Sequence, residues 1–222
     1  MASTTSPPHR LNSPLVVGLI GGMGSGKTTV AEVFARRGAV VVSGDLAGHE
    51  ALRQPGIREQ VVGRWGREVL EESGEVSRKK LGALVFGDPA ERKALEEMVF
   101  PWIKKNLRGQ IDAAKVKADA AVILLDAAIM LEAGWNSACD RLVFVEVPRE
   151  VRLKRLLDQR GWDEKEVAKR EQAQMPLDEK RNRADEVLDN SGSPDEVDRQ
   201  VERLLERWGV EQSRRKKEQG KK

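Results

Sequence analysis

The chain of 222 residues is 39% hydrophobic and 34% charged, which suits one enzyme-sized globular unit with a subsidiary lobe. Its net charge of +3 comes from the C-terminus, because residues 214–222 hold six Lys or Arg and one Glu, and the rest carries about −2. A single cysteine, Cys139, excludes an internal disulfide, and no apolar run is long enough to span a bilayer.

These features predict a soluble, cytoplasmic protein. Residues 1–13 are polar and lack the apolar stretch of a secretion signal, so we expect a disordered N-terminal extension. Residues 211–222 are expected to form a disordered basic tail. Such a tail could touch nucleic acid or acidic lipid, but a solvated tail is the simpler interpretation. We therefore expect a monomer that binds neither nucleic acid nor a membrane.

The first predicted strand, residues 15–20, leads into a glycine-rich turn that fits the pattern GxxxxGK[ST] over residues 21–28. Its glycines let the backbone turn tightly and aim N–H groups into a concavity, and the helix that begins near Gly26 adds its positive end. Such a P-loop holds phosphate oxygens, with Lys27 reaching the β- and γ-phosphates and the Thr28 hydroxyl coordinating Mg²⁺. The predicted ATP-binding residues are Gly22, Met23, Gly24, Ser25, Gly26, Lys27, Thr28 and Thr29.

A second strand, residues 39–42, is an apolar run without alternation, as expected for a strand buried on both faces of a parallel sheet. Asp45 follows it closely. Acids at strand ends in open α/β sheets face the ligand crevice, so Asp45 is the candidate base that orients and deprotonates an acceptor hydroxyl. The alternative for Asp45 is a turn or helix cap.

Residues 47–117 show helical spacing interrupted by Pro and Gly, which predicts a helical lobe inserted between two strands. Phe100-Pro101-Trp102 is expected to break one helix of this lobe, and a further helix resumes at Ile103. We call residues 47–117 the helical lobe.

Three further strands are predicted over residues 121–126, 142–147 and 186–189. Asp126 ends the first of them and is a candidate Mg²⁺ ligand through water, or else simply a residue that ends a strand. After the last strand, Ser193 and Pro194 predict the start of the final helix, Ser193 as its cap.

Charged helical segments lie between residues 148 and 183, and about 158–182 of them form a predicted lid over the phosphates. Arg160 precedes Gly161, where a mobile loop could bring the guanidinium onto the transferring phosphate, and Arg155 lies nearer the helix body. A solvated helix face is the alternative for both arginines.

The pattern as a whole predicts an α/β fold: a P-loop kinase-type parallel sheet flanked by helices, with an inserted helical substrate domain and a lid. The nucleotide-binding core comprises residues 14–46 and 118–210. No guanine-recognition motif or LSGGQ-like segment is present, and the length leaves no room for a pair of helicase cores. These absences favour a small-molecule kinase. A kinase for another small hydroxyl acceptor and an ATP-binding protein without turnover are the alternatives.

The sequence resembles the dephospho-CoA kinase family from about Val16 to Leu205. The resemblance is carried by residues 18–29, Val42-Ser43-Gly44-Asp45, Gln54-Pro55-Gly56, Val76-Ser77-Arg78, residues 126–132, Arg155-Leu156-Leu157, Gln174 and residues 184–192. It implies a kinase that uses ATP and Mg²⁺ to phosphorylate the ribose 3′-hydroxyl of dephospho-CoA, which the helical lobe holds.

The resemblance also implies roles for single residues. Asp45 matches the proposed base and, with Arg78 and Gln174, would bind the acceptor, and the loop around Asn190 would lie by the ATP adenine. The chain departs from the family pattern at three positions. The family usually has Asp, His and Pro at the positions of Ser43, Phe100 and Ala128.

Overall fold

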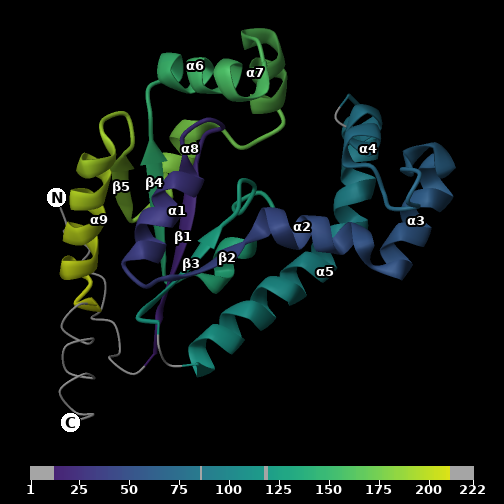
Figure 1. Ribbon diagram of the computed structural model, residues 1–222. Helices are drawn as coiled ribbons and strands as arrows, with labels where there is room; N and C mark the ends of the chain where they lie inside the picture. Colours follow the sequence, from purple (N-terminus) through teal and green to yellow (C-terminus); the bar gives the residue numbers. More distant parts are fainter. Residues whose placement is uncertain (1–12, 86, 118–119, 211–222) are drawn as a thin grey trace.

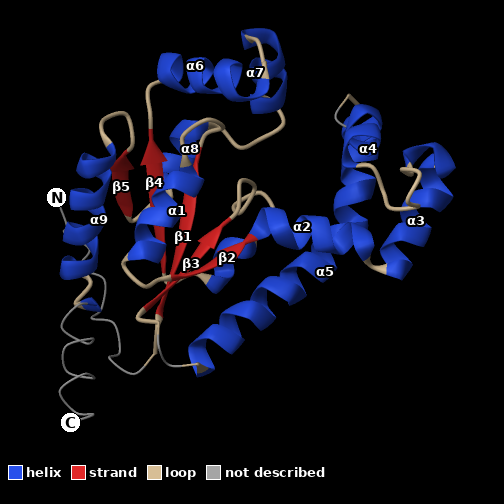
Figure 2. Ribbon diagram, in the orientation of Figure 1, coloured by secondary structure: helices blue, strands red, loops and turns tan. Residues whose placement is uncertain are grey.

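The computed structural model describes residues 13–85, 87–117 and 120–210. Its centre is a five-stranded sheet in the order β2-β3-β1-β4-β5, and every neighbouring pair of strands is parallel (Figure 2). The strands are β1 (Leu15–Gly21), β2 (Val40–Ser43), β3 (Val122–Asp126), β4 (Arg141–Glu146) and β5 (Glu186–Asp189).

Helices cover both faces of the sheet (Figure 1). One face packs against α1 (Lys27–Arg36) and α9 (Pro194–Arg207). The other face packs against α2 (Gly44–Arg53) and α5 (Pro89–Val116). Between these two helices in the chain lie α3 (Pro55–Trp65), the 3₁₀ helix η1 (Arg67–Val69) and α4 (Arg78–Val85), which pack on α2, α5 and one another and extend the same core away from the sheet. The remaining elements are η2 (Trp135–Ala138), α6 (Arg149–Arg160), α7 (Glu164–Glu171) and α8 (Leu177–Asn182).

The two-sided core explains the composition of the central strands. In β1, Leu15, Val17 and Leu19 belong to the α1/α9 side, whereas Val16 and Ile20 belong to the α5 side. Because successive side chains of a strand point to opposite faces, a central strand between two helical layers needs apolar residues throughout. This confirms the prediction of a parallel α/β sheet.

The prediction that the second strand is buried on both faces is wrong. β2 stands at the edge of the sheet, and Val40 and Val41 are 41% and 39% exposed. Its only strand neighbour among the described residues is β3, so one edge of β2 has no strand beside it to cover its side chains. Apolar composition alone does not separate an edge strand from a central one.

The expected helix break at Pro101 is also wrong, because α5 runs through this residue without interruption. A proline inside a helix removes one hydrogen bond and crowds the preceding turn. Here Val99, Ile103 and Leu107 are buried on one side of α5, and their packing holds the helix together across the proline.

The last helix begins as predicted. Ser193 Oγ accepts a hydrogen bond from the Glu196 amide, and the Glu196 carboxylate accepts one from the Ser193 amide, which together form a capping box with Pro194 at the first helical position. The predicted basic tail and all but Ser13 of the predicted N-terminal extension lie outside the described residues. Across the ranges that the structure describes, no helix combines the length and apolarity needed to cross a membrane.

Candidate active site

The glycine-rich turn joins β1 to α1 and packs closely against other elements. Gly24 and Gly26 have φ values of 74° and 76°, in the left-handed region that favours glycine. A Cβ atom on Gly24 would lie 2.8 Å from the Arg152 backbone oxygen, and one on Gly26 would lie 2.4 Å from Asn190 Nδ2. The turn therefore presents bare backbone, which is the surface that a phosphate chain needs.

Lys27 is the first residue of α1 and folds back over this turn. Its Nζ atom donates hydrogen bonds of 3.1 Å to the Gly21 and Gly22 carbonyl oxygens. Burial lowers the pKa of Lys27 from 10.5 to about 8, and Asp126 is the largest opposing influence. The ammonium group is thus held at the loop, in a place where its charge costs free energy until an anion binds.

Two carboxylates act on Lys27 electrostatically: Asp126 at the carboxyl end of β3, and Asp45, which follows β2. Asp126 ends β3 and pairs in register with Leu19 of β1 on one side and Ser43 of β2 on the other. Burial raises the pKa of Asp126, while Lys27 lowers it and Asp45 raises it. Lys27, Asp126 and Asp45 therefore lie within electrostatic range of one another, as the sequence led us to expect.

Asp45 does not end the strand but lies in the first turn of α2, where it is exposed. The N-cap of α2 is Ser43, whose Oγ accepts a 3.2 Å hydrogen bond from the Leu46 amide. Asp45 is thus not the cap that was the alternative to a catalytic role. An acid in the first turn is favoured by the positive end of the helix.

The two arginines predicted as catalytic, Arg155 and Arg160, have different surroundings in the structure. Arg155 Nη2 donates a 2.8 Å hydrogen bond to the backbone oxygen of Asn190, beside the glycine-rich turn. Arg160 is exposed at the end of α6, and its guanidinium lies 4.9 Å from the centre of the Trp162 ring. Arg155 therefore lies next to residues of the predicted ATP site, whereas Arg160 packs on Trp162 within the predicted lid segment.

A third arginine was missed as a site residue. Arg152 is 4% exposed, and its Nη1 donates hydrogen bonds to the Met23 carbonyl (3.2 Å) and to Glu171 of α7 (2.7 Å). It precedes Arg155 by three residues and therefore lies on the same side of α6. That spacing is the signal that could have found it.

A buried lysine was missed as well. Lys180 of α8 is 1% exposed and lies 2.8 Å from a carboxylate oxygen of Glu132. It also donates to the Ala128 carbonyl and to Gln174 Oε1, each at 3.3 Å. Gln174, predicted to bind the acceptor, thus contacts Lys180, and Ala128 meets the same lysine through its carbonyl. The charged segment around Lys180 gave no local signal of burial.

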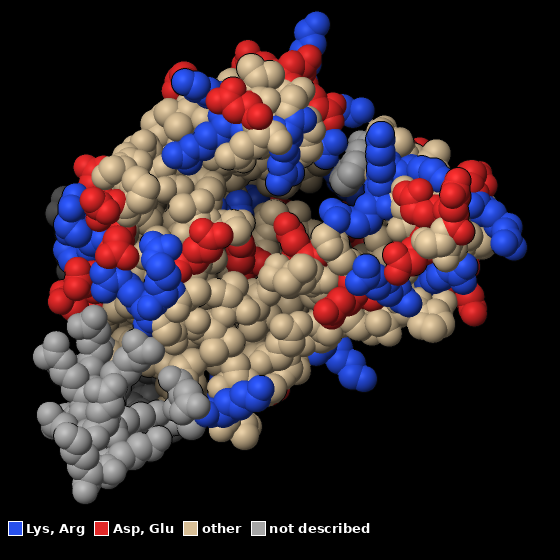
Figure 3. Space-filling view, viewed as in Figure 1, with Lys and Arg blue, Asp and Glu red and all other residues tan. Residues whose placement is uncertain are grey.

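Arg78 opens α4 and is exposed. It lowers the pKa of His49 in α2, after the larger effect of burial. Figure 3 shows the molecule hollowed between the lid and the helical lobe, with basic and acidic side chains around the hollow. The two parts touch where Arg92 Nη1 donates to the Ala173 carbonyl at 3.4 Å. Thr28 and Thr29, in the first turn of α1, are exposed.

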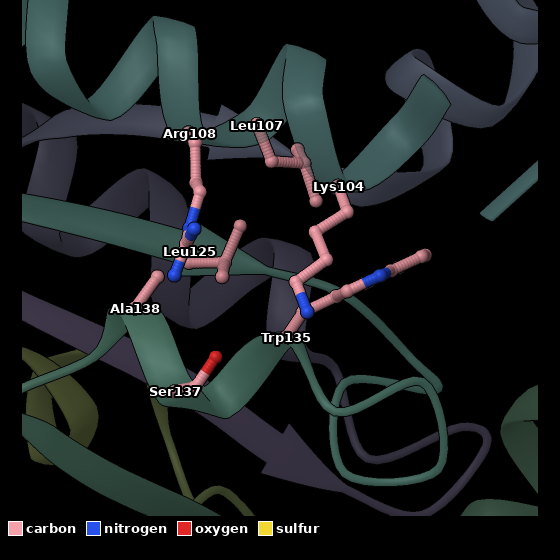
Figure 4. A pocket seen from close by; sticks show the side chains of 7 residues that line it. All are labelled: Lys104, Leu107, Arg108, Leu125, Trp135, Ser137 and Ala138. Carbon is pink, nitrogen blue, oxygen red and sulfur yellow. The ribbon is translucent and has the colours of Figure 1, made fainter. Parts of the chain in front are cut away.

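Phe100 packs edge-on against Trp135 at a centroid distance of 5.4 Å. A small second cavity lies beside this pair, between α5 and η2 (Figure 4). Its lining is formed by Lys104, Leu107, Arg108, Leu125, Trp135, Ser137 and Ala138. None of the predicted site residues belongs to this lining, so the cavity is separate from the P-loop site.

The fold and the site are those of a P-loop kinase: a parallel sheet, a P-loop after its central strand, a lysine on that loop and Asp126 at the end of the adjacent strand β3. The sequence profile described as dephospho-CoA kinase matches residues 15–196. A dephospho-CoA kinase from Bacillus licheniformis is 38% identical over 196 residues, which is 87% of this chain and 96% of that protein. The chain therefore belongs to the dephospho-CoA kinase family.

Two solved structures have the same fold. A crystal structure from Thermus thermophilus is 33% identical, with a TM-score of 0.72 and coverage of 87% of this chain and 97% of that one. A dephospho-CoA kinase from Campylobacter jejuni, at 19% identity, shows the same fold with a TM-score of 0.59, covering 87% and 96% of the two chains. The predicted family, fold class and kinase activity are confirmed; the roles of single residues stay predictions.

Proposed function

We propose that this chain transfers the γ-phosphoryl group of ATP to the ribose 3′-hydroxyl of dephospho-CoA, which completes coenzyme A. The observation that supports this most directly is the proximity of three charged residues that belong to three different elements. Lys27 of the P-loop, Asp126 of β3 and Asp45 of α2 lie within electrostatic range at one edge of the sheet. Phosphoryl transfer to a hydroxyl uses a cation that binds the phosphates, an acid that holds the metal ion and a base that accepts the hydroxyl proton. Lys27, Asp126 and Asp45 would supply these three groups in that order.

Each residue has a task in this proposal. Backbone N–H groups of residues 22–28 and the Lys27 ammonium bind the phosphates of ATP, and Asp45 accepts the proton of the acceptor hydroxyl. The Thr28 hydroxyl and the Asp126 carboxylate would hold Mg²⁺, which neutralises phosphate charge when it is bound. Two protein oxygens suit a metal that takes its other ligands from phosphate and water, and the described residues contain no cluster of three His, Cys, Asp or Glu.

The helical lobe would hold the acceptor, with Arg78 as one of its binding residues. Arg78 is exposed and lies near His49 and Asp45 of α2, so a phosphate group of the acceptor there would be fixed beside the proposed base. Gln174 would reach the acceptor from the lid. Its bond to Lys180 holds the Gln174 amide in one orientation.

The test is formation of coenzyme A from dephospho-CoA and ATP with Mg²⁺, beside ATP hydrolysis without acceptor. We expect transfer that requires dephospho-CoA and falls at least about 10²-fold in Lys27→Ala. Transfer to another hydroxyl compound but not to dephospho-CoA would indicate a different acceptor. ATP binding without any transfer would indicate a nucleotide-binding protein without turnover. Either result would overturn the proposal.

A further inference from the structure

Two carbonyl groups of the P-loop are held from outside the motif by buried side chains. Arg152 Nη1 donates to the Met23 carbonyl at 3.2 Å, and Asn190 Nδ2 donates to the Ser25 carbonyl at 2.7 Å. Arg152 belongs to α6, Asn190 directly follows β5, and they are only 4% and 6% exposed. The loop conformation thus depends on residues far from it in the sequence.

Each of these bonds fixes the direction of an N–H group. A peptide unit is planar and trans, so its C=O and its N–H point in opposite directions. A Met23 carbonyl held on Arg152 therefore turns the Gly24 N–H away from α6, and a Ser25 carbonyl held on Asn190 turns the Gly26 N–H away from that side chain. Glycine restricts its own backbone least, so the two peptides would otherwise be free to rotate.

Arg152 also links the loop to the lid. The same Nη1 atom that holds Met23 lies 2.7 Å from Glu171 Oε1, at the end of α7. Glu171 in turn lies 3.7 Å from Arg149, which belongs to α6. Within the described part of the chain, Arg152 Nε has no hydrogen-bond acceptor. The Arg152 guanidinium is thus shared between the Met23 carbonyl of the P-loop and the Glu171 carboxylate of α7.

We propose that Arg152 and Asn190 are positioning residues that hold the P-loop in its phosphate-receiving shape before ATP arrives, and that Glu171 aims Arg152. The inference rests on the proposed function, because it assigns the P-loop to the phosphates of ATP. It gives Asn190 a second task besides its predicted place near the adenine. A preorganised loop binds more tightly because less freedom is lost on binding.

The experiment compares ATP with inorganic tripolyphosphate, which carries no base and no ribose, by calorimetry and by competition against ATP. In Arg152→Met and in Asn190→Ala we expect the affinity for both ligands to fall by the same factor, about 10-fold or more. Arg149→Met is the matched control, because Arg149 shares Glu171 but has no contact to the loop among the described residues. It should stay within about 2-fold of the wild type.

Kinetics separate positioning from a general loss of structure. Loss of preorganisation should raise the KM for ATP and leave both the KM for dephospho-CoA and kcat at saturating ATP within a few-fold. Because Arg152→Met removes a buried cation and could unfold, Arg152→Lys and Glu171→Gln serve as milder variants with intermediate losses. Thermal unfolding shows whether each variant remains folded.

Several results would overturn the inference. Unchanged affinity for tripolyphosphate in folded variants of both residues would remove the positioning role. A loss for ATP alone would place Asn190 at the base instead, and a rise in both KM values would indicate a purely structural effect. Wild-type protein that binds both ligands but does not phosphorylate dephospho-CoA would contradict the proposed function and leave this inference standing.

Discussion

The ammonium group of Lys180 lies 2.8 Å from the Glu132 carboxylate, although the lysine side chain is only 1% exposed. Glu132 Oε1 also accepts a 3.0 Å hydrogen bond from the Met175 amide. The Glu132 carboxylate, in the loop after β3, therefore binds two residues of the predicted lid, Lys180 and Met175. The loop that follows Asp126 and the segment that carries Gln174 are held together at this ion pair.

Breaking this ion pair from one side should destabilise the protein. Lys180→Met leaves the Glu132 carboxylate without its counter-ion, and Glu132→Gln leaves the buried Lys180 ammonium without its counter-ion, so each should lower the free energy of unfolding by about 3 kcal/mol. This is the lower end of the usual range, because the Glu132 side chain is 22% exposed. The double variant should lose less than the sum of the two, as measured by urea unfolding. Additive losses would contradict an energetic coupling.

Titration of Lys27 should make ATP binding depend on pH. The pKa of Lys27 is lowered to about 8 in the ligand-free protein, so the side chain is mainly charged below pH 8 and loses its proton above it. Phosphate binding favours the charged form, and ATP affinity should therefore weaken by up to about tenfold per pH unit above pH 8, with proton uptake. Calorimetry from pH 7 to 9.5 in buffers of different ionisation enthalpy measures both effects.

Lys27→Arg is the control for this pH dependence. A guanidinium stays protonated throughout the range, so the variant should bind ATP with a flat pH profile whatever its absolute affinity. A flat profile in the wild type, or an equally steep one in Lys27→Arg, would show that another group causes the change.

Replacement of Asp45 by Asn should separate ATP binding from transfer. Asp45 is exposed in the first turn of α2, where Asn fits without loss of packing. Without the base, coenzyme A formation should fall by about 10²- to 10⁴-fold while ATP affinity stays nearly unchanged. Glu50→Gln is the control on the same helix and should retain activity. Normal activity of Asp45→Asn would remove the proton-acceptor role.

The two lid-side arginines should respond differently to truncation. Arg155 holds the Asn190 backbone oxygen, so Arg155→Ala should raise the KM for ATP by about 10-fold or more. For Arg160→Ala, we expect a lower kcat with little change in ATP affinity, because a lid arginine meets the phosphates only on closure. Steady-state kinetics with varied ATP distinguish the two. A silent Arg160→Ala beside a crippled Arg155→Ala would transfer the lid role to Arg155.

The fold and the P-loop were accessible from the sequence because their signals are contiguous. Residues 21–28 form the loop as one uninterrupted motif, and Ser193 with Glu196 encodes the start of α9 within four residues. Asp126 was predicted for a related reason. The carboxyl ends of all strands in a parallel sheet lie at the same edge, so an acid that ends a strand must lie at the edge where the ligand binds.

The two buried ion pairs that involve α6, α7 and α8 could not be predicted in this way. Arg152 and Glu171 belong to two helices of the charged segment between residues 148 and 183, and Lys180 of the same segment pairs with Glu132 of the loop after β3. A charged residue in such a segment is usually solvated, and only the three-dimensional path of the chain shows which ones are buried. The edge position of β2 was hidden for the same reason, because strand order depends on contacts between distant residues.

The strand order also determines when the ATP site can form during synthesis. β1 is made first, but its two neighbours begin only at Val122 and Arg141. Helices α2 to α5 contact one another and can assemble from local segments before those strands exist. The helical lobe should therefore fold ahead of the P-loop, which stays without its supporting sheet until β3 and β4 have left the ribosome.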